Sequence, residues 1–117
     1  MAEAFYNHFT HTENAVSAGI LDFTPAKYGH PISEVVTVMN EEGIDVSKKI
    51  VKTVTEKMSL EADHIYVLCK REECPAFLLK EERKITFWKI NDPFGSSIGN
   101  FRLVRDQIKA LVKSIIV

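Results

Sequence analysis

The sequence of 117 residues contains no apolar run approaching the roughly 20 residues of a membrane-spanning helix. Its first eight residues include an acidic side chain and no apolar stretch, which argues against a secretion signal. The net charge is only -1, so electrostatics give no reason to expect a nucleic-acid partner. Two cysteines are too few for a disulfide scaffold. These absences predict a cytoplasmic protein with neither a membrane nor a nucleic acid as partner.

Several familiar functional motifs are also missing. The sequence has no glycine-rich phosphate loop, no Gly-x-Ser-x-Gly and no His-Glu-x-x-His. A zinc site would need further ligands beside the two cysteines, and no nearby Cys-x-x-Cys or His-x-x-x-His supplies them. We therefore expect neither a metal nor a resident cofactor.

The composition is that of an ordinary globular protein, with 45% hydrophobic and 26% charged residues. The length corresponds to about one domain, and neither an internal repeat nor a linker interrupts the sequence. We therefore expect residues 1–117 to form a single domain.

Apolar periodicity and breaker residues predict helices alternating with strands. The helices are expected at 2–9, 31–43, 53–60 and 98–115, and the strands at 14–19, 64–69 and 84–90. Thr53 and Glu56 have the spacing of a capping box at the start of the third helix. This order predicts an α/β fold with three layers, in which a mostly parallel sheet carries helices on both faces. Such domains normally open with a strand, whereas this chain starts at a helix.

Cys69 and Cys74 are the first candidate site. Cys69 closes a buried strand, and Cys74 lies in the following loop, just before Pro75. The carboxyl edge of a parallel sheet is where α/β proteins bind ligands. The spacing allows a disulfide if the loop folds back, and in the cytosol such a bond would be transient and redox-active. The alternative is one buried and one exposed thiol with no redox role.

Asp92 is the second candidate. It follows the strand that ends at Ile90, so parallel strands would place it at the same end of the sheet as the cysteines. A carboxylic acid there can protonate a leaving oxygen. Asp92-Pro93 is also a common way to open a turn, and that interpretation stays open.

Five stretches taken in order resemble one family. They are residues 1–8, 17–19, 39–47, 67–75 and 88–95, the last followed by 101–108. The chain is similar to the low-molecular-weight protein tyrosine phosphatases and to the arsenate reductases built on the same fold. The similarity covers essentially the whole chain and depends on the order and spacing of the motifs together. It implies a four-stranded parallel sheet flanked by helices.

The resemblance also implies an anion site whose residues are missing from this sequence. In the family, a loop between the first strand and the first helix holds a nucleophilic cysteine, five further residues and an arginine. The loop amides and the arginine hold phosphate or arsenate, and the helix N-terminus lowers the thiol pKa. Met1 corresponds to the residue after this loop, and neither Cys69 nor Cys74 has an arginine at the required spacing. We therefore expect a domain truncated at its N-terminus relative to the family, with the first strand missing.

Part of the family's chemistry still carries over by resemblance. Asp92 matches the general acid that protonates the leaving oxygen. Cys69 and Cys74 lie where thioredoxin-coupled arsenate reductases keep cysteines that relay a disulfide, with a shorter spacing than in the best-known members. Phosphotyrosine phosphatases often place Tyr after the Pro of this acid loop. Phe94-Gly95 stands there instead, which favours the reductase branch.

Three functions follow as hypotheses, and whether the chain is itself an enzyme stays open. The first is an arsenate reductase-like protein that uses Asp92 as acid, the two cysteines as relay and a thioredoxin- or glutathione-type reductant. The second is a tyrosine phosphatase-type phosphomonoester hydrolase, whose Asp92 acts as acid and then as base. The third is a catalytically dead relative that binds a partner. A small oxyanion substrate would need the missing loop, so the isolated chain is expected to be inactive.

The missing strand also predicts an association. An unpaired strand edge at the centre of a sheet is costly, so something must fill the position. Residues 114–117 or a second copy of the chain would serve. We therefore expect a homodimer or a rearranged edge.

Overall fold

The computed structural model describes residues 1–19, 31–50, 52–91, 93 and 95–116. The loop expected at 21–29 lies outside these residues. The elements in chain order are α1 (Ala2–Thr10), α3 (Ser33–Asn40), α4 (Glu56–Glu61), β1 (Ile65–Val67), the 3-10 helix η1 (Arg71–Glu73), α5 (Ala76–Leu79), the 3-10 helix η2 (Glu82–Lys84), β2 (Ile85–Phe87) and α6 (Ile98–Ile115).

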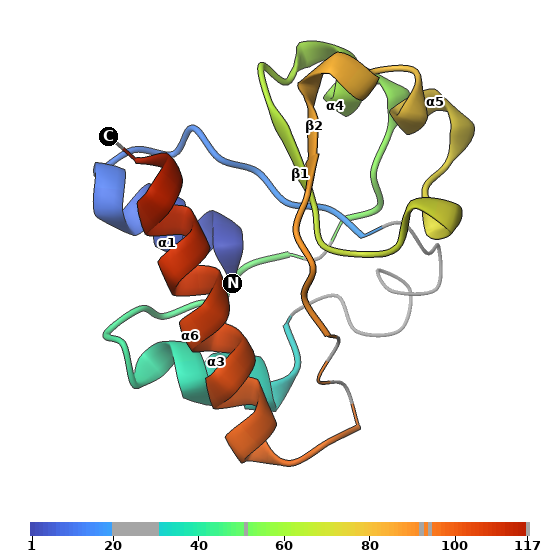
Figure 1. Ribbon diagram of the computed structural model, residues 1–117. Coiled ribbons are helices and arrows are strands. Elements are labelled where there is room, and N and C mark those ends of the chain that lie inside the picture. Colours follow the sequence, from blue (N-terminus) through green and yellow to red (C-terminus); the bar gives the residue numbers. More distant parts are fainter. Residues whose placement is uncertain (20–30, 51, 92, 94, 117) are drawn as a thin grey trace.

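The sheet is formed by β1 and β2, which run parallel. Ile65 lies opposite Ile85 and Val67 lies opposite Phe87, and the amide of Trp88 donates to the carbonyl of Val67 at 2.8 Å. Parallel strands need a crossover connection, and here η1, α5 and η2 provide it. Figure 1 shows the two strands between α4 and α5 on one side and α1, α3 and α6 on the other. The expected layered α/β fold with a parallel sheet is therefore confirmed.

The strand expected at 14–19 is only partly present. Gly19 makes an isolated parallel bridge with Thr53, in which the Gly19 amide donates to the Lys52 carbonyl at 2.7 Å and the Val54 amide to the Gly19 carbonyl at 2.8 Å. Residues 13–18 are irregular. Only the end of the expected strand therefore pairs, and its partner is the segment before α4.

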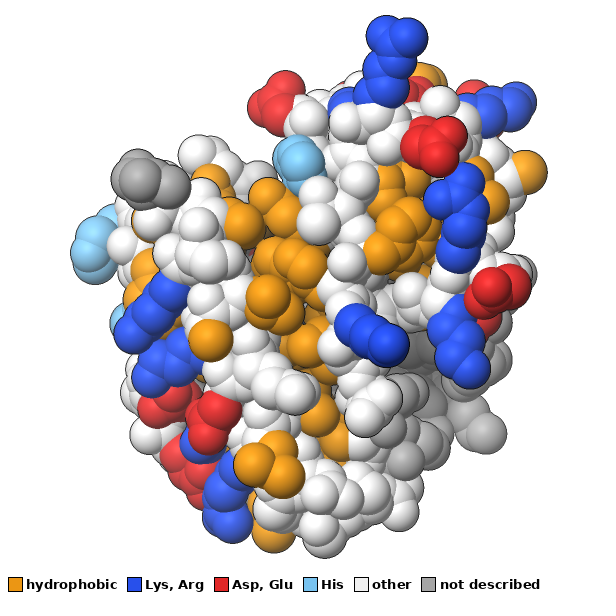
Figure 2. Space-filling view, in the orientation of Figure 1, with side chains coloured by type: hydrophobic (Ala, Val, Ile, Leu, Met, Phe, Trp, Pro, Cys, Tyr) orange, Lys and Arg blue, Asp and Glu red, His pale blue; other side chains and the backbone are white. Residues whose placement is uncertain are grey.

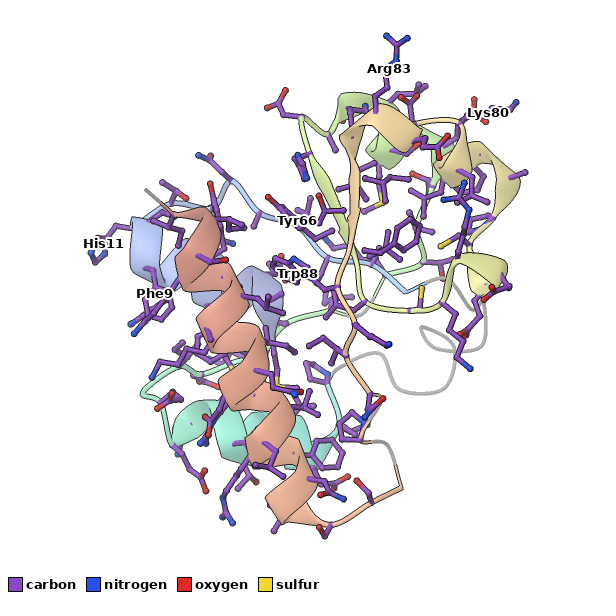
Figure 3. The ribbon with its side chains drawn as sticks, in the orientation of Figure 1. Phe9, His11, Tyr66, Lys80, Arg83 and Trp88 are labelled. Atoms are coloured by element: carbon purple, nitrogen blue, oxygen red, sulfur yellow. The ribbon has the colours of Figure 1, made fainter. Side chains whose placement is uncertain are left out.

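The main core lies between the sheet and the helices α1, α3 and α6. Tyr66 and Trp88 extend from the strands toward α6, with their ring centroids 4.5 Å apart (Figure 3). Along α6, apolar residues recur every three or four positions, which puts them on one face. The buried members of this core are Ala4, Phe5, Met39, Val46, Trp88, Val104, Ile108 and Val112.

The opposite face of the sheet is covered more thinly. Val67 alternates with Tyr66 and therefore points to the other side, toward α4 and α5. Val67 and Leu78 are buried. The Lys84 ammonium donates to the carbonyls of Ser59 at 2.7 Å and Leu60 at 3.3 Å, which ties the start of β2 to the end of α4.

An ion cluster joins α3 to α6. Glu41, just past α3, accepts from Arg102 at 2.8 Å and from Arg105 at 2.6 Å. Beside it, Lys109 donates to Glu42 at 2.6 Å. The hydrogen bonds from the two arginines lower the pKa of Glu41 from about 4.5 to about 2. Residues far apart in the sequence thus connect these two helices.

Two helix starts differ from the sequence prediction. The predicted cap, Thr53, is wrong because its backbone pairs with Gly19. The helix begins instead after Thr55, whose side chain accepts from the Met58 amide at 3.2 Å. The second helix begins at Ser33 rather than at Pro31, and Gly43 follows it with φ 75, a left-handed conformation that suits glycine.

The short helices between β1 and β2 were not predicted from the sequence. η1, α5 and η2 have three or four residues each, too few to show a helical period. By contrast, α6 has the predicted bounds, because its 18 residues carry five turns of apolar spacing.

Among the helices in the described ranges, none is both long and apolar enough to cross a membrane.

Candidate functional site

The two cysteines lie on a short closed loop at the carboxyl end of β1. Cys69 follows β1 by two residues, and Cys74 ends η1. The amide of Glu73 donates to the Lys70 carbonyl at 3.0 Å, and that of Cys74 to the Arg71 carbonyl at 3.1 Å. These bonds turn the chain back on itself, as the sequence prediction required. The loop thereby brings Cys74 beside Cys69.

Both thiols are free and half-buried, so the expected contrast between a buried and an exposed thiol is absent, and a redox role stays a prediction. The Cys74 thiol donates to the Lys70 carbonyl at 3.7 Å. The pKa of Cys69 is raised to about 11, and burial is the largest cause. The charge of the adjacent Cys74 thiol and its hydrogen bond raise this pKa further. Cys69 is therefore a neutral thiol at physiological pH.

Arg71 fixes this loop to the following elements. Its guanidinium lies 5.7 Å from the centroid of the Phe87 ring in β2 and donates to the Glu82 carboxylate at 3.3 Å. The Lys70 amide donates to the Glu73 carboxylate at 3.4 Å across the turn. The thiol pair is thus held by β1 on one side and by β2 and η2 on the other.

Asp92 lies outside the described residues, so its place relative to the cysteines stays a prediction. Its neighbours Asn91 and Pro93 line a cavity of about 290 Å³ against the first turns of α6. The other lining residues are Ser96, Asn100, Leu103, Val104 and Gln107. Neither Cys69 nor Cys74 is among the described residues that line this cavity.

A second cavity, of about 210 Å³, lies at the start of α1. The lining includes Met1, Glu3 of α1, Ser17, Gly19 and the two lysines Lys49 and Lys52. Ser17 donates to Glu3 at 3.0 Å, and burial lowers the pKa of the Met1 amine. The positive end of a helix and two cations favour a small anion here, while Glu3 opposes one.

The residues that line this second cavity were not predicted from the sequence. They come from separate segments of the chain, and no spacing in the sequence marks them as neighbours. The sequence also predicts that the chain has no metal site, and this stays a prediction. Within the described part of the chain, no three His, Cys, Asp or Glu side chains gather closely enough to hold an ion.

The chain matches a family model along nearly its full length. Residues 1–116 match the family described as "Low molecular weight phosphotyrosine protein phosphatase". An arsenate reductase of Brevibacillus brevis is 31% identical, and the alignment covers 97% of this chain and 81% of that protein. Arsenate reductase 2 of Staphylococcus epidermidis is 28% identical over 79 residues, which are 68% of this chain. That alignment covers only 60% of the staphylococcal protein.

Solved structures confirm the fold. Wzb of Vibrio vulnificus, in complex with benzylphosphonate, superposes with a TM-score of 0.85 at 20% identity, covering 97% of this chain and 84% of that chain. The tyrosine phosphatase AmsI of Erwinia amylovora gives a TM-score of 0.83 at 19% identity, covering 96% and 78%. At such identities the similarity concerns the fold alone.

Proposed function

Because the chain belongs to the low molecular weight phosphotyrosine protein phosphatase family, we propose that it has the arsenate reductase type of activity within that family. The reaction would be the thiol-dependent reduction of arsenate to arsenite. Residues 1–117 contain no Cys-x5-Arg loop, so turnover requires this loop to be supplied. The curated relatives named arsenate reductases support the choice of reaction.

The observation that carries this proposal is the pair of adjacent thiols, Cys69 and Cys74. Reduction of arsenate transfers two electrons to arsenic, and two thiol sulfurs lose one electron each as they form a disulfide. A disulfide that includes the nucleophile must then be moved away before the next turnover. Two thiols held side by side at the sheet edge suit that task, whereas phosphate ester hydrolysis has no use for them.

The geometry also suggests an order of exchange. Thiolates attack disulfides, and Cys69 is neutral because its pKa is about 11. We therefore assign the first attack to Cys74, on the nucleophile sulfur of the arsenic adduct, which releases arsenite and leaves a mixed disulfide. Cys69 then gives up its proton and attacks the Cys74 sulfur. The nucleophile sulfur leaves as a thiolate, takes up a proton, and the Cys69–Cys74 disulfide is complete. A thioredoxin-type reductant, in the cytoplasm, would reduce this bond by the same exchange. Asp92 would supply the proton to the departing oxygen.

The test uses a hybrid that places a strand and a Cys-x5-Arg loop ahead of Met1. Arsenate-dependent NADPH oxidation is measured with thioredoxin and thioredoxin reductase. We expect turnover by the hybrid, none by residues 1–117 alone, and loss of turnover in Cys69→Ser and Cys74→Ser. Asp92→Asn should lower the rate by roughly 100-fold or more.

A phosphatase activity is the second candidate, because the matched family is described by its phosphotyrosine activity. The hybrid would then hydrolyse p-nitrophenyl phosphate, and neither Cys69→Ser nor Cys74→Ser would affect the rate. Hydrolysis of p-nitrophenyl phosphate without any arsenate-dependent NADPH oxidation would support the phosphatase activity over the reductase activity. A hybrid that is correctly folded, binds the anion and catalyses neither reaction would indicate a binding relative instead.

A further inference from the structure

The loop that carries the two thiols is already closed before any reaction takes place. The Lys70 carbonyl accepts from both the Glu73 amide, at 3.0 Å, and the Cys74 thiol, at 3.7 Å. The Cys74 thiol also hydrogen bonds with Cys69. Neither residue is enclosed, since each is half-buried. Two soft ligands therefore lie side by side on one loop.

Such a pair suits an element that binds two sulfurs and requires no third protein ligand. Thiol sulfur is a soft ligand, and it selects soft, thiophilic elements. Zinc normally takes four ligands in a structural site or three in a catalytic one. Within the described residues, no third His, Cys, Asp or Glu is placed to complete a metal site with the pair. Trivalent arsenic fits better, because its third position can keep a hydroxyl or an organic group.

We propose that Cys69 and Cys74 form a chelating site for trivalent arsenic, the oxidation state produced by arsenate reduction. The choice of arsenic rests on the proposed function, whereas the binding itself needs no nucleophile loop. Arsenous acid, As(OH)₃, condenses with the two thiols. Two As–O bonds break, two As–S bonds form and two water molecules leave, so that no atom is oxidised or reduced. The site would hold the product of the reaction at the loop that also relays the electrons.

The state of the thiols agrees with this chemistry. In the condensation, each thiol proton leaves with an arsenic hydroxyl as water, so the reaction consumes neutral thiols. The raised pKa of Cys69 keeps that thiol neutral at physiological pH. Arg71 stabilises the loop through Phe87 and Glu82, so little ordering has to accompany binding.

The test measures binding to residues 1–117 as they are, reduced with a phosphine rather than a thiol. Arsenite and phenylarsine oxide are titrated while free thiols are counted and intact mass is recorded. We expect one arsenic per chain, loss of both thiols, and their recovery on adding 2,3-dimercaptopropanol. Cys69→Ser and Cys74→Ser should each weaken binding by roughly 100-fold or more, because chelation is lost. Circular dichroism checks that both variants are folded.

A matched variant and a second ion sharpen the result. Arg71→Ala keeps both thiols but releases the loop, and it should bind more weakly than the parent and more tightly than either serine variant. Zn²⁺ should not compete with phenylarsine oxide. Unchanged thiol counts, equal binding by a single-cysteine variant, or effective competition by Zn²⁺ would each overturn the inference. The hybrid assay is separate: arsenate turnover without arsenic binding refutes only this site, and binding without turnover refutes only the proposed reaction.

Discussion

At the scale of single residues, the chemistry of Cys69 is altered by its surroundings. Its thiol is half-buried and adjoins a second thiol, and both facts disfavour its negative charge. Cys74 contributes through both its charge and its hydrogen bond. The reactivity of one cysteine is thus set in part by the other.

This environment predicts a pH dependence of alkylation. The rate of Cys69 modification by iodoacetamide should rise toward a midpoint near pH 11, since only the thiolate reacts. Cys74→Ser removes one cause of the raised pKa and should move the midpoint down. Peptide mass spectrometry after timed quenching measures the rate at Cys69 alone. A midpoint near the ordinary value of about 8.5 in the parent chain would contradict the structure.

Residue-scale predictions from the sequence succeeded where the chain neighbours decide the outcome. The return of Cys74 to Cys69 depends on one short turn, and the spacing of the two cysteines allows it if the loop folds back, as it does. The cavity at the start of α1 is lined by Glu3 together with Lys49 and Lys52, which are far from it in the sequence. No local pattern encodes such an arrangement. The role and position of Asp92 stay predictions.

At the scale of elements, the helix α6 is held to α3 by charge as well as by apolar packing. Glu41 lies between Arg102 and Arg105, and both arginines stabilise its ionised form. The folded-state pKa of Glu41 is lower than the unfolded one. The stabilisation is therefore complete above pH 4.5 and is lost as the pH falls from about 4.5 to about 2.

Glu41→Gln tests this linkage. The variant should be less stable than the parent at pH 7. The difference should shrink as the pH falls toward 2, because protonation of Glu41 removes from the parent the ionic stabilisation that the variant lacks at every pH. Urea unfolding at pH 7, 4 and 3 gives the free energies. Glu13→Gln, at an exposed position outside the cluster, is the control and should follow the parent. A constant difference at all three pH values would rule out the linkage.

The start of α4 provides a second element-scale prediction. Thr55→Ala removes the side chain that accepts from the Met58 amide, and the free energy of unfolding should fall by about 1 kcal/mol. Thr55→Ser keeps the hydroxyl and should stay close to the parent. Equal stability of the alanine and serine variants in urea unfolding would show that Thr55 is not the cap.

The two candidate caps also show why elements are only partly predictable. Thr53 and Thr55 both precede a helical pattern, and Thr53 even has Glu56 at the favoured spacing. Pairing with Gly19 decides between them, and that is a long-range contact. The bounds of α6 needed no such information, because apolar residues recur along its whole length.

At the scale of the whole molecule, the described part of the chain leaves the two-stranded sheet with open edges. Val67 accepts from Trp88 on the β2 side. In a parallel strand, successive residues direct their amide groups to opposite sides, so those of Tyr66 face away from β2. Among the described residues, no strand pairs with β1 along that side. Figure 2 also shows apolar side chains at the surface in a band between α6 and the strands.

Open edges and surface apolar area predict self-association. We expect sedimentation equilibrium to give twice the chain mass of 13.3 kDa at micromolar concentration. Lowering the concentration should shift the mass toward that of the monomer. A mass of one chain at all concentrations would refute the homodimer. The other expectation, that residues 114–117 fill the strand position, is wrong for Ser114 and Ile115, because both lie in α6.

The bond from Lys84 to the carbonyls that end α4 makes this amine a reporter of native structure. An engaged, partly covered ammonium reacts slowly with acylating reagents, whereas solvent-exposed lysines such as Lys57 react at once. Lysine footprinting along a denaturant series would therefore give the denaturant concentration at which α4 separates from the sheet, without any introduced probe.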